Sequence, residues 1–313
     1  MATTPGRMPP PLPLSRRDAL RALGLLLAAP AFPPALRALA PDPDSERLRA
    51  WVERLRAAGL AETATPLGRA VARAGEQALG TPYVAGTLEE YLRAGGDPAA
   101  EPLTLSLTRF DCVTLVEASI AVARVALDPC RDMWRRFATE IERVRYRDGR
   151  RAGYATRLHY FSEWIADGAR RGLLQDLTPT LGGAPDNRPL RFMTEHRAGY
   201  PALADDATFA AIGAMEQRLD AAPRTVIPTD RIAAVSDRIE SGDVLAFATA
   251  IPGLDVTHTA LAWRRPDGVL GVLHAPLSGG VVEVARLPLT DYVAAIRRAT
   301  GIMVARPLPG GEG

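Results

Sequence analysis

The chain has 313 residues, of which 47% are hydrophobic, 24% charged and 6% aromatic. This composition is that of an ordinary globular protein and argues against intrinsic disorder, collagen-like repeats and a long coiled coil. The net charge is +2, and all 38 basic residues are arginine. We attribute the absence of lysine to coding bias, because no binding surface would exclude every lysine.

Residues 1–40 contain, in order, the three parts of an export leader. Residues 15–20 (SRRDAL) resemble the twin-arginine export motif, and the apolar stretch 22–29 is too short to span a bilayer. Residues 38–40 (ALA) supply a small-x-small cleavage pattern. We therefore expect a periplasmic or secreted bacterial protein with no stable membrane insertion after cleavage. An amphipathic N-terminal helix of a cytoplasmic protein is the alternative.

The predicted leader also accounts for the basic charge. Residues 1–40 hold five arginines and one aspartate, so removing their +4 from the total of +2 leaves −2 on the rest of the chain. The charge therefore gives no evidence of an anionic partner such as nucleic acid. The arginine run at 143–151 contains one aromatic residue, Tyr146, which is too few for a base-stacking surface.

The first half of the remaining chain is predicted to be helical. Apolar residues at helical spacing predict helices over residues 44–58, 66–80, 111–126, 133–144 and 158–171. A short strand is expected around residues 103–107. From 173 to about 236 the pattern weakens, apart from a helix over 206–219, and we interpret this segment as an insertion that walls a site.

After residue 241 the apolar period changes to two, which is typical of strands. The predicted strands cover residues 244–248, 258–263, 269–273, 281–284 and 302–305, with a helix over 289–299. Helices followed by a meandering antiparallel sheet make an α+β layout. We expect a single domain over residues 41–313.

Cys112 is the first candidate for chemistry. It opens the predicted apolar helix, where unpaired N–H groups and the positive end of the helix dipole lower the pKa of a thiol. A buried structural cysteine explains the position equally well. Cys130 lies just beyond the other end of the helix, so we expect two free thiols and no disulfide. No Cys/His cluster has ligand spacing, so no metal is expected.

A reactive thiol needs a base, and two histidines lie on neighbouring predicted strands. His258 starts one strand and His274 ends the next, on either side of a turn at residues 266–268 (PDG). Both lie eight residues from residue 266, so a hairpin centred on that residue would make them near neighbours. Two unrelated polar residues at strand ends are the alternative.

Several blocks of the sequence, taken in order, resemble the NlpC-type papain-like peptidoglycan hydrolases. They are GTPYVAG (80–86), FDC (110–112), SGDV (241–244), TH (257–258) and HA (274–275). The blocks that resemble the N-acetylmuramoyl-L-alanine amidase-like branch are DCVTLVE (111–117), RLHYFSEWI (157–165), GLDVTH (253–258), TGI (300–302) and RP (306–307). Many relatives have Ser-Gly where this chain has Val113-Thr114, which favours that branch. The resemblance runs from about residue 75 to 307.

The resemblance implies a papain-like core, in which N-terminal helices pack on the C-terminal sheet. It makes Cys112 the nucleophile, His258 the general base and His274 the residue that orients the base. Tyr83 matches the tyrosine that lies beside the nucleophile in this family and would help to bind the oxyanion. No metal or organic cofactor is implied.

Four further polar residues are candidate substrate contacts. Asp111 directly precedes the thiol. Arg157 could clamp a substrate carboxylate or form a surface salt bridge. His159 lies in an aromatic cluster, where a structural role is favoured over a role in a pocket. Asp255 could cap a turn, which is the simpler interpretation, or accept a hydrogen bond from a substrate amine.

The resemblance therefore implies an exported cysteine amidase that cleaves the N-acetylmuramoyl–L-alanine bond of peptidoglycan fragments, 1,6-anhydro muropeptides among them. The alternative enzyme is a γ-D-glutamyl–diamino acid endopeptidase with the same three catalytic residues. The alternative from another class is a catalytically silent muropeptide-binding module, which would not need a nucleophile.

Overall fold

The computed structural model describes residues 42–62, 64–276 and 280–310, and the predicted export leader lies outside these residues. The helices are α3 (Pro43–Ala57), α4 (Leu67–Gln77), α5 (Glu90–Arg93), α6 (Cys112–Leu127), α7 (Met133–Arg145), α8 (Phe161–Arg170), α9 (Phe192–Glu195), α10 (Asp206–Asp220), α11 (Ile232–Val235) and α12 (Leu289–Ala295). The long helices predicted from apolar spacing are confirmed to within a few residues at either end.

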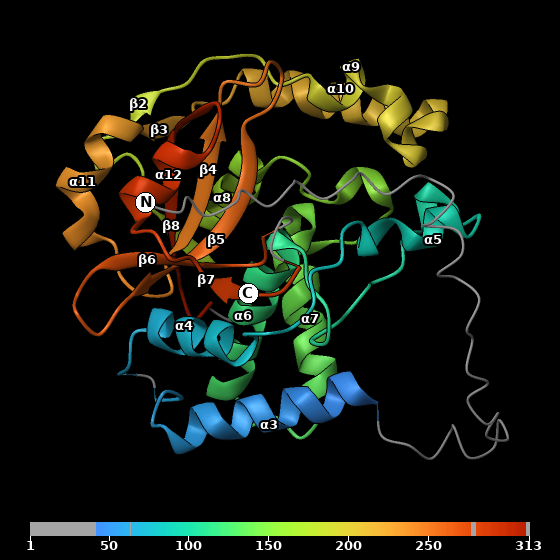
Figure 1. Ribbon diagram of the computed structural model, residues 1–313. Coiled ribbons are helices and arrows are strands. Elements are labelled where there is room, and N and C mark those ends of the chain that lie inside the picture. Colours follow the sequence, from blue (N-terminus) through green and yellow to red (C-terminus); the bar gives the residue numbers. More distant parts are fainter. Residues whose placement is uncertain (1–41, 63, 277–279, 311–313) are drawn as a thin grey trace, which may run out of the picture. The chain divides into compact units, whose positions relative to one another are not determined.

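The strands form one antiparallel sheet in the described part of the chain. They are β1 (Leu174–Asp176), β2 (Ala184–Pro185), β3 (Thr225–Pro228), β4 (Val244–Thr249), β5 (Val256–Arg264), β6 (Leu270–His274), β7 (Glu283–Val284) and β8 (Ala299–Pro307). Their order is β2-β3-β8-β4-β5-β6-β7, and β1 also pairs with β8. The predicted α+β layout is confirmed (Figure 1). The assignment to a papain-like core stays a prediction.

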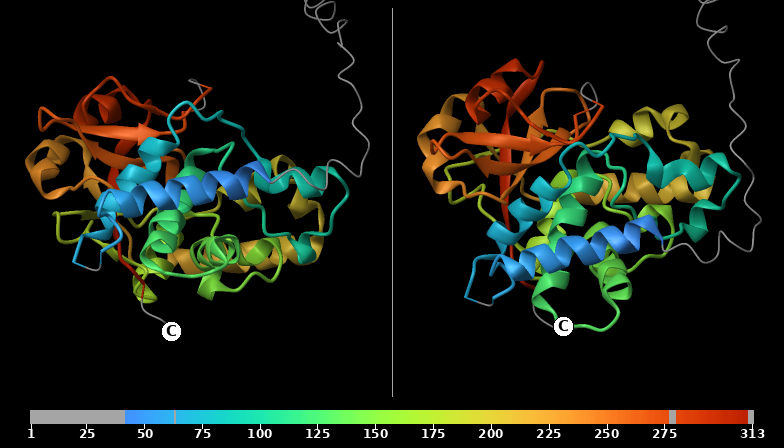
Figure 2. Two further views of the ribbon diagram at one scale, coloured as in Figure 1. Left: turned by 90° about the horizontal axis from the view of Figure 1, so that it is seen from below. Right: turned by 60° about the horizontal axis from the view of Figure 1, so that its bottom comes forward.

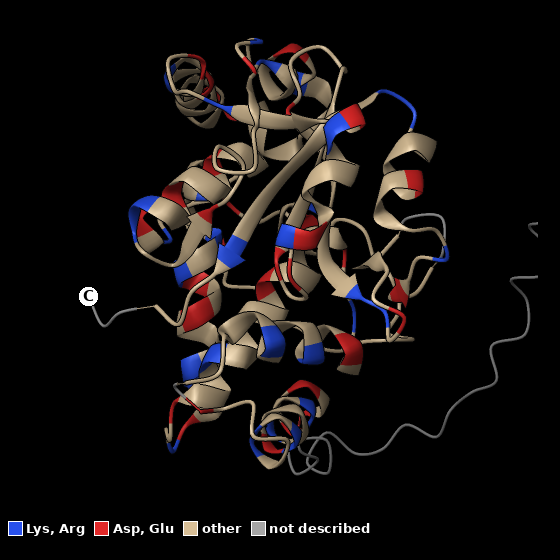
Figure 3. Cartoon of the chain, turned by 90° about the vertical axis from the view of Figure 1, so that its left-hand side faces the viewer, with Lys and Arg blue, Asp and Glu red and all other residues tan. Residues whose placement is uncertain are grey.

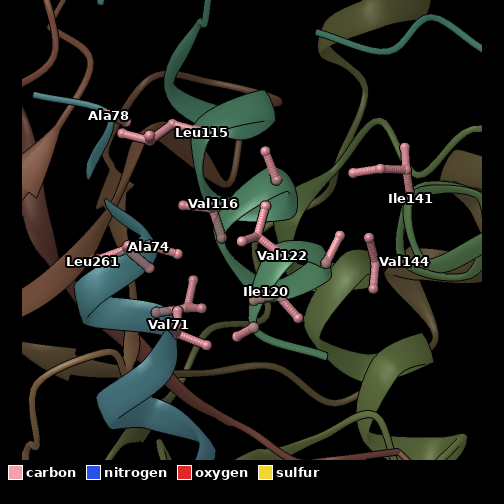
Figure 4. Packing of buried hydrophobic residues seen from close by; sticks show 14 of the residues in the cluster. Val71, Ala74, Ala78, Leu115, Val116, Ile120, Val122, Ile141, Val144 and Leu261 are labelled. Atoms are coloured by element: carbon pink, nitrogen blue, oxygen red, sulfur yellow. The ribbon is translucent and has the colours of Figure 1, made fainter. Parts of the chain in front are cut away.

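Helix α6 is the centre of the core. Every residue from Thr114 to Ala126 is buried, so the helix has no polar face, as expected for a helix surrounded by other elements. It contacts α3, α4, α7 and β5. In Figure 4 its apolar side chains meet those of α4 and α7 and Leu261 of β5. Helices α3 and α4 lie side by side in Figure 1 and in both views of Figure 2.

Two charged side chains of α6 are also buried, and both are paired. Glu117 accepts a hydrogen bond from Arg145 of α7 at 2.8 Å. Arg124 donates to Glu140 of α7 at 3.2 Å and to the carbonyl of Leu173 at 2.5 Å. Removing one member of a buried pair leaves an uncompensated charge, at a cost of about 3–5 kcal/mol. These pairs therefore fix α6 against α7 and against the start of β1.

The side chains of β5 alternate between two hydrophobic clusters. Leu261 packs with Leu273 in the cluster around α6, whereas Ala260 packs with Phe247 in the cluster on the other face of the sheet. His258, two residues before Ala260 and paired with Phe247, therefore lies on the face that α12 covers. The two faces of the sheet meet different helices.

Two expectations about irregular segments differ from the structure. The strand predicted at 103–107 is wrong, because these residues have no strand partner and the N–H of Leu107 donates instead to the carboxylate of Asp44 at 2.6 Å. The segment 173–236 contains more strand than its weak pattern indicated, since it supplies β1, β2 and β3. The helix predicted at 206–219 is confirmed as α10.

Charged residues of both signs are interspersed on the side of the chain drawn in Figure 3. Within residues 42–62, 64–276 and 280–310, none of the helices has the length and apolar character of a membrane span.

Gly242 allows the chain to enter β4 close to α4. Its φ is +89°, and a Cβ at this position would lie 1.9 Å from the carbonyl oxygen of Gly68. Gly268, in the turn between β5 and β6, has a similar φ of +84° but nothing within 4 Å of its Cβ position. The two glycines therefore share the left-handed backbone and differ in the space beside it.

We predict that Gly242→Ala lowers the free energy of unfolding by about 3 kcal/mol more than Gly268→Ala does, because only the former forces two backbones apart. Gly268→Ala should cost about 1–2 kcal/mol, the strain of a left-handed alanine. Urea unfolding of both variants measures the difference. Equal losses would contradict the close approach of Gly242 to α4.

Candidate active site

Cys112 occupies the first position of α6, and Asp111 caps the helix. The carboxylate of Asp111 accepts a hydrogen bond from the N–H of Thr114 at 2.8 Å, while the Thr114 hydroxyl accepts one from the N–H of Asp111 at 2.8 Å. This reciprocal capping box explains why the helix begins at the cysteine. Both cysteines are free thiols, as the sequence predicted.

Three residues from separate parts of the chain interact with the thiol of Cys112. The backbone N–H and the hydroxyl of Thr259 in β5 lower its pKa, so this residue lies close to the sulfur. Burial raises the pKa values of Tyr83 and Tyr292, and the charge of the Cys112 thiolate contributes to the rise in both. Tyr83 is held by backbone bonds, with its N–H donating to the carbonyl of Gly280 at 2.8 Å. The site thus combines the loop before α6, strand β5 and helix α12.

Burial, together with the neighbouring carboxylate of Asp111, raises the pKa of the Cys112 thiol to about 11. The sequence predicted a lowered pKa from the helix N-terminus, and this prediction is wrong. Loss of hydration disfavours the thiolate more than the helix N–H groups and Thr259 favour it. Cys112 keeps some surface exposure as a residue, yet its sulfur is enclosed by protein. At neutral pH the thiol is protonated.

The two predicted histidines lie in direct contact. Nε2 of His258 is 2.8 Å from Nδ1 of His274, and the two rings meet edge to face at 74°. Leu261 pairs with Leu273, so the hairpin is centred on residue 267 and not on residue 266 as predicted. The two histidines are therefore offset by two residues, and their side chains meet diagonally across β5 and β6. The contact survives because a shift of two residues keeps both side chains on one face. Phe247 stacks on His258 at a centroid distance of 5.7 Å.

Both imidazoles are neutral at physiological pH. Burial, together with the neighbouring His274, lowers the pKa of His258 to about 3. Burial also lowers the pKa of His274 to about 4. Among the hydrogen bonds of the described residues there is none between Cys112 and His258. Such bonds often tighten only when substrate binds, so a proton could pass from the thiol to His258 during attack.

Tyr292 and Glu283 complete the surroundings of His274. The hydroxyl of Tyr292 is 3.0 Å from Nδ1 of His274, and Oε1 of Glu283 is 3.9 Å from Nε2. Sequence reasoning missed both, together with Thr259. The Gly-Gly pair at positions 279–280 of the sequence was a usable turn signal for Glu283, which the structure pairs with His274 in the β6–β7 register. No local signal pointed to Tyr292, because α12 returns to the site only through the tertiary fold.

Arg157, His159 and Asp255 all have partners other than Cys112. Arg157 is buried and paired, at 2.5 Å from Glu89 and 3.6 Å from Glu101, and these carboxylates raise its pKa. Such a guanidinium already has carboxylate partners, which favours the structural interpretation over a substrate clamp. It lies over the ring of Tyr154 in a cation–π contact.

His159 and Asp255 make local structural contacts. Nε2 of His159 is 2.8 Å from the carbonyl oxygen of Tyr154, and burial lowers its pKa well below the ordinary value. The carboxylate of Asp255 accepts hydrogen bonds from the N–H groups of Ser162, at 2.8 Å, and Val256, at 2.7 Å. Asp255 therefore ties the first turn of α8 to the start of β5. In the described part of the chain no three His, Cys, Asp or Glu side chains gather as a metal would require.

We predict that Asp111→Asn increases the alkylation rate of Cys112 by about threefold to about tenfold at pH 8, because it removes a negative charge that opposes the thiolate. Asparagine retains the oxygen that caps α6. The measurement is iodoacetamide labelling followed by mass spectrometry, in a Cys130→Ala background that leaves one reactive thiol.

Asp132→Asn is the matched control. Asp132 caps α7 through the N–H of Arg135 at 2.9 Å, so the same charge is lost at another helix N-terminus. This variant should label at the parent rate. An unchanged rate in Asp111→Asn as well would show that the carboxylate does not influence the thiol.

Comparison with known proteins identifies similar sequences and structures. A model of the AmiA-like, N-acetylmuramoyl-L-alanine amidase-like family matches residues 73–302. The crystal structure of an N-acetylmuramoyl-L-alanine amidase from Bacteroides uniformis is similar, with a TM-score of 0.69 and 32% identity over 77% of this chain and 99% of that chain. No match was found among curated proteins.

Two further structures share the fold. A Bacteroides fragilis protein, provisionally described as a xylanase, has 33% identity and a TM-score of 0.66 over 74% of this chain and 99% of that chain. A Legionella pneumophila protein has 18% identity and a TM-score of 0.60 over 85% of this chain and 95% of that chain, and it supports the fold alone.

Proposed function

Because the chain belongs to the N-acetylmuramoyl-L-alanine amidase-like family, we propose that it is a cysteine amidase acting on peptidoglycan fragments. The bond it hydrolyses joins the lactyl carboxyl of N-acetylmuramic acid to the amino group of L-alanine. One observation carries the cysteine mechanism: the thiolate of Cys112, at the first position of α6, acts electrostatically on Tyr292, whose hydroxyl is 3.0 Å from Nδ1 of His274, the imidazole that contacts His258. We assign this arrangement to a papain-like core.

The reaction begins from a neutral thiol and a neutral imidazole. As the sulfur of Cys112 attacks the amide carbonyl carbon, His258 takes the thiol proton. The backbone N–H of Cys112 and the Tyr83 hydroxyl donate hydrogen bonds to the oxyanion that forms. His258 then gives its proton to the nitrogen of L-alanine, the carbon–nitrogen bond breaks, and a thioester remains on Cys112.

Water completes the cycle. His258 removes a proton from water as the water oxygen attacks the thioester carbonyl, and the sulfur leaves as the restored thiol after taking the proton back. The products are the lactyl carboxylate of the sugar and a peptide with a free L-alanine amino group. No residue in this scheme requires a bound metal or an organic cofactor.

We further propose that 1,6-anhydro muropeptides are substrates and that residues 1–40 direct export, so that the enzyme meets these fragments outside the cytoplasm. Resemblance to the amidase-like branch supports the first, and the order of leader parts supports the second. Cell fractionation tests the location, and accumulation of the mature protein in the cytoplasm would contradict it.

The test of activity is mass spectrometry of defined muropeptides incubated with the mature protein. We expect a free stem peptide that begins with L-alanine and a sugar that carries a lactyl carboxylate, with anhydro fragments cleaved faster than intact murein. Cys112→Ala should lower the rate by at least about 10³-fold, because it removes the nucleophile. Cys130→Ala, the matched control for the second thiol, should retain the parent rate.

Three other outcomes would favour the alternatives. A fragment that begins with the diamino acid would assign the same residues to a γ-D-glutamyl endopeptidase. Full activity in Cys112→Ala would refute the cysteine mechanism. Binding of muropeptides without any product would favour a silent binding module.

We predict that kcat/KM is independent of pH between about pH 5 and about pH 9. His258 acts as a base only in its neutral form, and its pKa of about 3 keeps it neutral throughout this range. The thiol, with a pKa of about 11, stays protonated. A pH–rate profile with an acid limb near 6.5 would contradict the lowered pKa of the base, and an inflection below 7 in cysteine alkylation would indicate a preformed ion pair.

A further inference from the structure

The contact between His258 and His274 allows only two arrangements of protons. Two neutral imidazoles have one N–H each, and Nε2 of His258 faces Nδ1 of His274 at 2.8 Å. One of these nitrogens must carry a proton and the other a lone pair, since two lone pairs or two protons would repel each other. The proton therefore lies either on Nε2 of His258 or on Nδ1 of His274.

Only the first arrangement of protons allows His258 to act as a base. When His258 has its proton on Nε2, its Nδ1 has a free lone pair that can accept the thiol proton of Cys112. When the shared proton lies on Nδ1 of His274, His258 must have its own proton on Nδ1. That nitrogen then has no free lone pair and cannot accept a proton. The tautomer of His274 thus decides whether His258 can act.

The hydroxyl of Tyr292 favours the first arrangement. It lies 3.0 Å from Nδ1 of His274, the nitrogen that His258 also contacts. If this nitrogen has a lone pair, the hydroxyl can donate to it in a three-centre hydrogen bond that it shares with the N–H of His258. If the nitrogen carries the proton, the hydroxyl hydrogen loses its only acceptor among the described residues, which costs free energy in a half-buried position.

The carboxylate of Glu283 favours the same arrangement from the other side of the ring. Nε2 of His274 is buried and has no hydrogen-bond partner in the described part of the chain. Oε1 of Glu283, opposite His274 in the β6–β7 register, lies 3.9 Å from it. A negative charge at this distance stabilises an N–H and repels a lone pair, so it places the proton of His274 on Nε2.

We propose that Tyr292 and Glu283 are positioning residues that hold His274 in its Nε2–H tautomer and thereby keep Nδ1 of His258 free to act as the base. This inference rests on the proposed role of His258. It extends the pair of histidines to a set of four side chains from β5, β6, β7 and α12. Neither added residue needs to touch the substrate.

The test combines nitrogen NMR of histidine-labelled protein with steady-state kinetics. In the parent protein at pH 7 both rings should give the signature of the Nε2–H tautomer. Tyr292→Phe keeps the ring that packs against Phe247 and removes only the hydroxyl. Glu283→Gln keeps the size of a half-exposed side chain and removes only the charge. Each variant should populate the Nδ1–H tautomer.

Each variant should also lower kcat by about tenfold with little change in KM, because the base is lost from part of the population and substrate contacts remain. Asp291→Asn is the matched control, since it removes one exposed negative charge beside Tyr292 in α12. It should change neither the NMR signature nor kcat. Tautomers that stay unchanged in both Tyr292→Phe and Glu283→Gln would overturn the proposal.

The NMR measurement separates this proposal from the proposed function. If Cys112→Ala retained full activity, the cysteine mechanism would be refuted while the tautomers of His258 and His274 would still respond to Tyr292→Phe. If instead Cys112→Ala is inactive and the tautomers do not respond, the amidase mechanism stands and the positioning role is refuted.

Discussion

Burial of α6 on all sides is the constraint on which the site depends. Every residue of the helix from Thr114 to Ala126 is buried, and the helix lies between α3, α4, α7 and β5, so its N-terminus is held against the sheet beside Thr259. Burial also removes water from the thiol of Cys112 and, on the face of the sheet that α12 covers, from the imidazole of His258. Because desolvation disfavours charge of either sign, it raises the pKa of the thiol and lowers that of the imidazole. The packing that buries the thiol and the imidazole therefore also keeps both of them neutral.

A neutral thiol beside a neutral base has consequences for catalysis. No thiolate–imidazolium ion pair exists before the substrate is attacked, so proton transfer has to accompany the attack. The groups that donate hydrogen bonds to the oxyanion have to act at the same moment. Asp111 has two opposed effects in this respect. Its carboxylate fixes the start of α6 through Thr114, and the same charge raises the pKa of the thiol that the helix presents. Precise placement of the nucleophile therefore comes with a lower resting reactivity.

The sequence was sufficient where structure follows from local pattern. Helical spacing located α6 and α10 within one or two residues, and the twofold period located β4, β5 and β6. It failed for β1, β2 and β3, which have between two and four residues and are specified mainly by distant partners, as when Leu174 pairs with Pro307. It also failed for the pKa of Cys112, since depth of burial is a property of the assembled core.

The pairing of His258 with His274 could be predicted even though its register could not. The hairpin is centred on Asp267, because the N–H of Arg265 donates to the carbonyl of Val269 and Gly268 takes a left-handed conformation. This moves the register by two residues from the expected one. Side chains alternate with a period of two, so such a shift preserves the shared face, whereas a shift of one would have separated the imidazoles. The sequence therefore predicts that the two histidines lie on the same face of the sheet, and the turn determines only whether their contact is direct or diagonal.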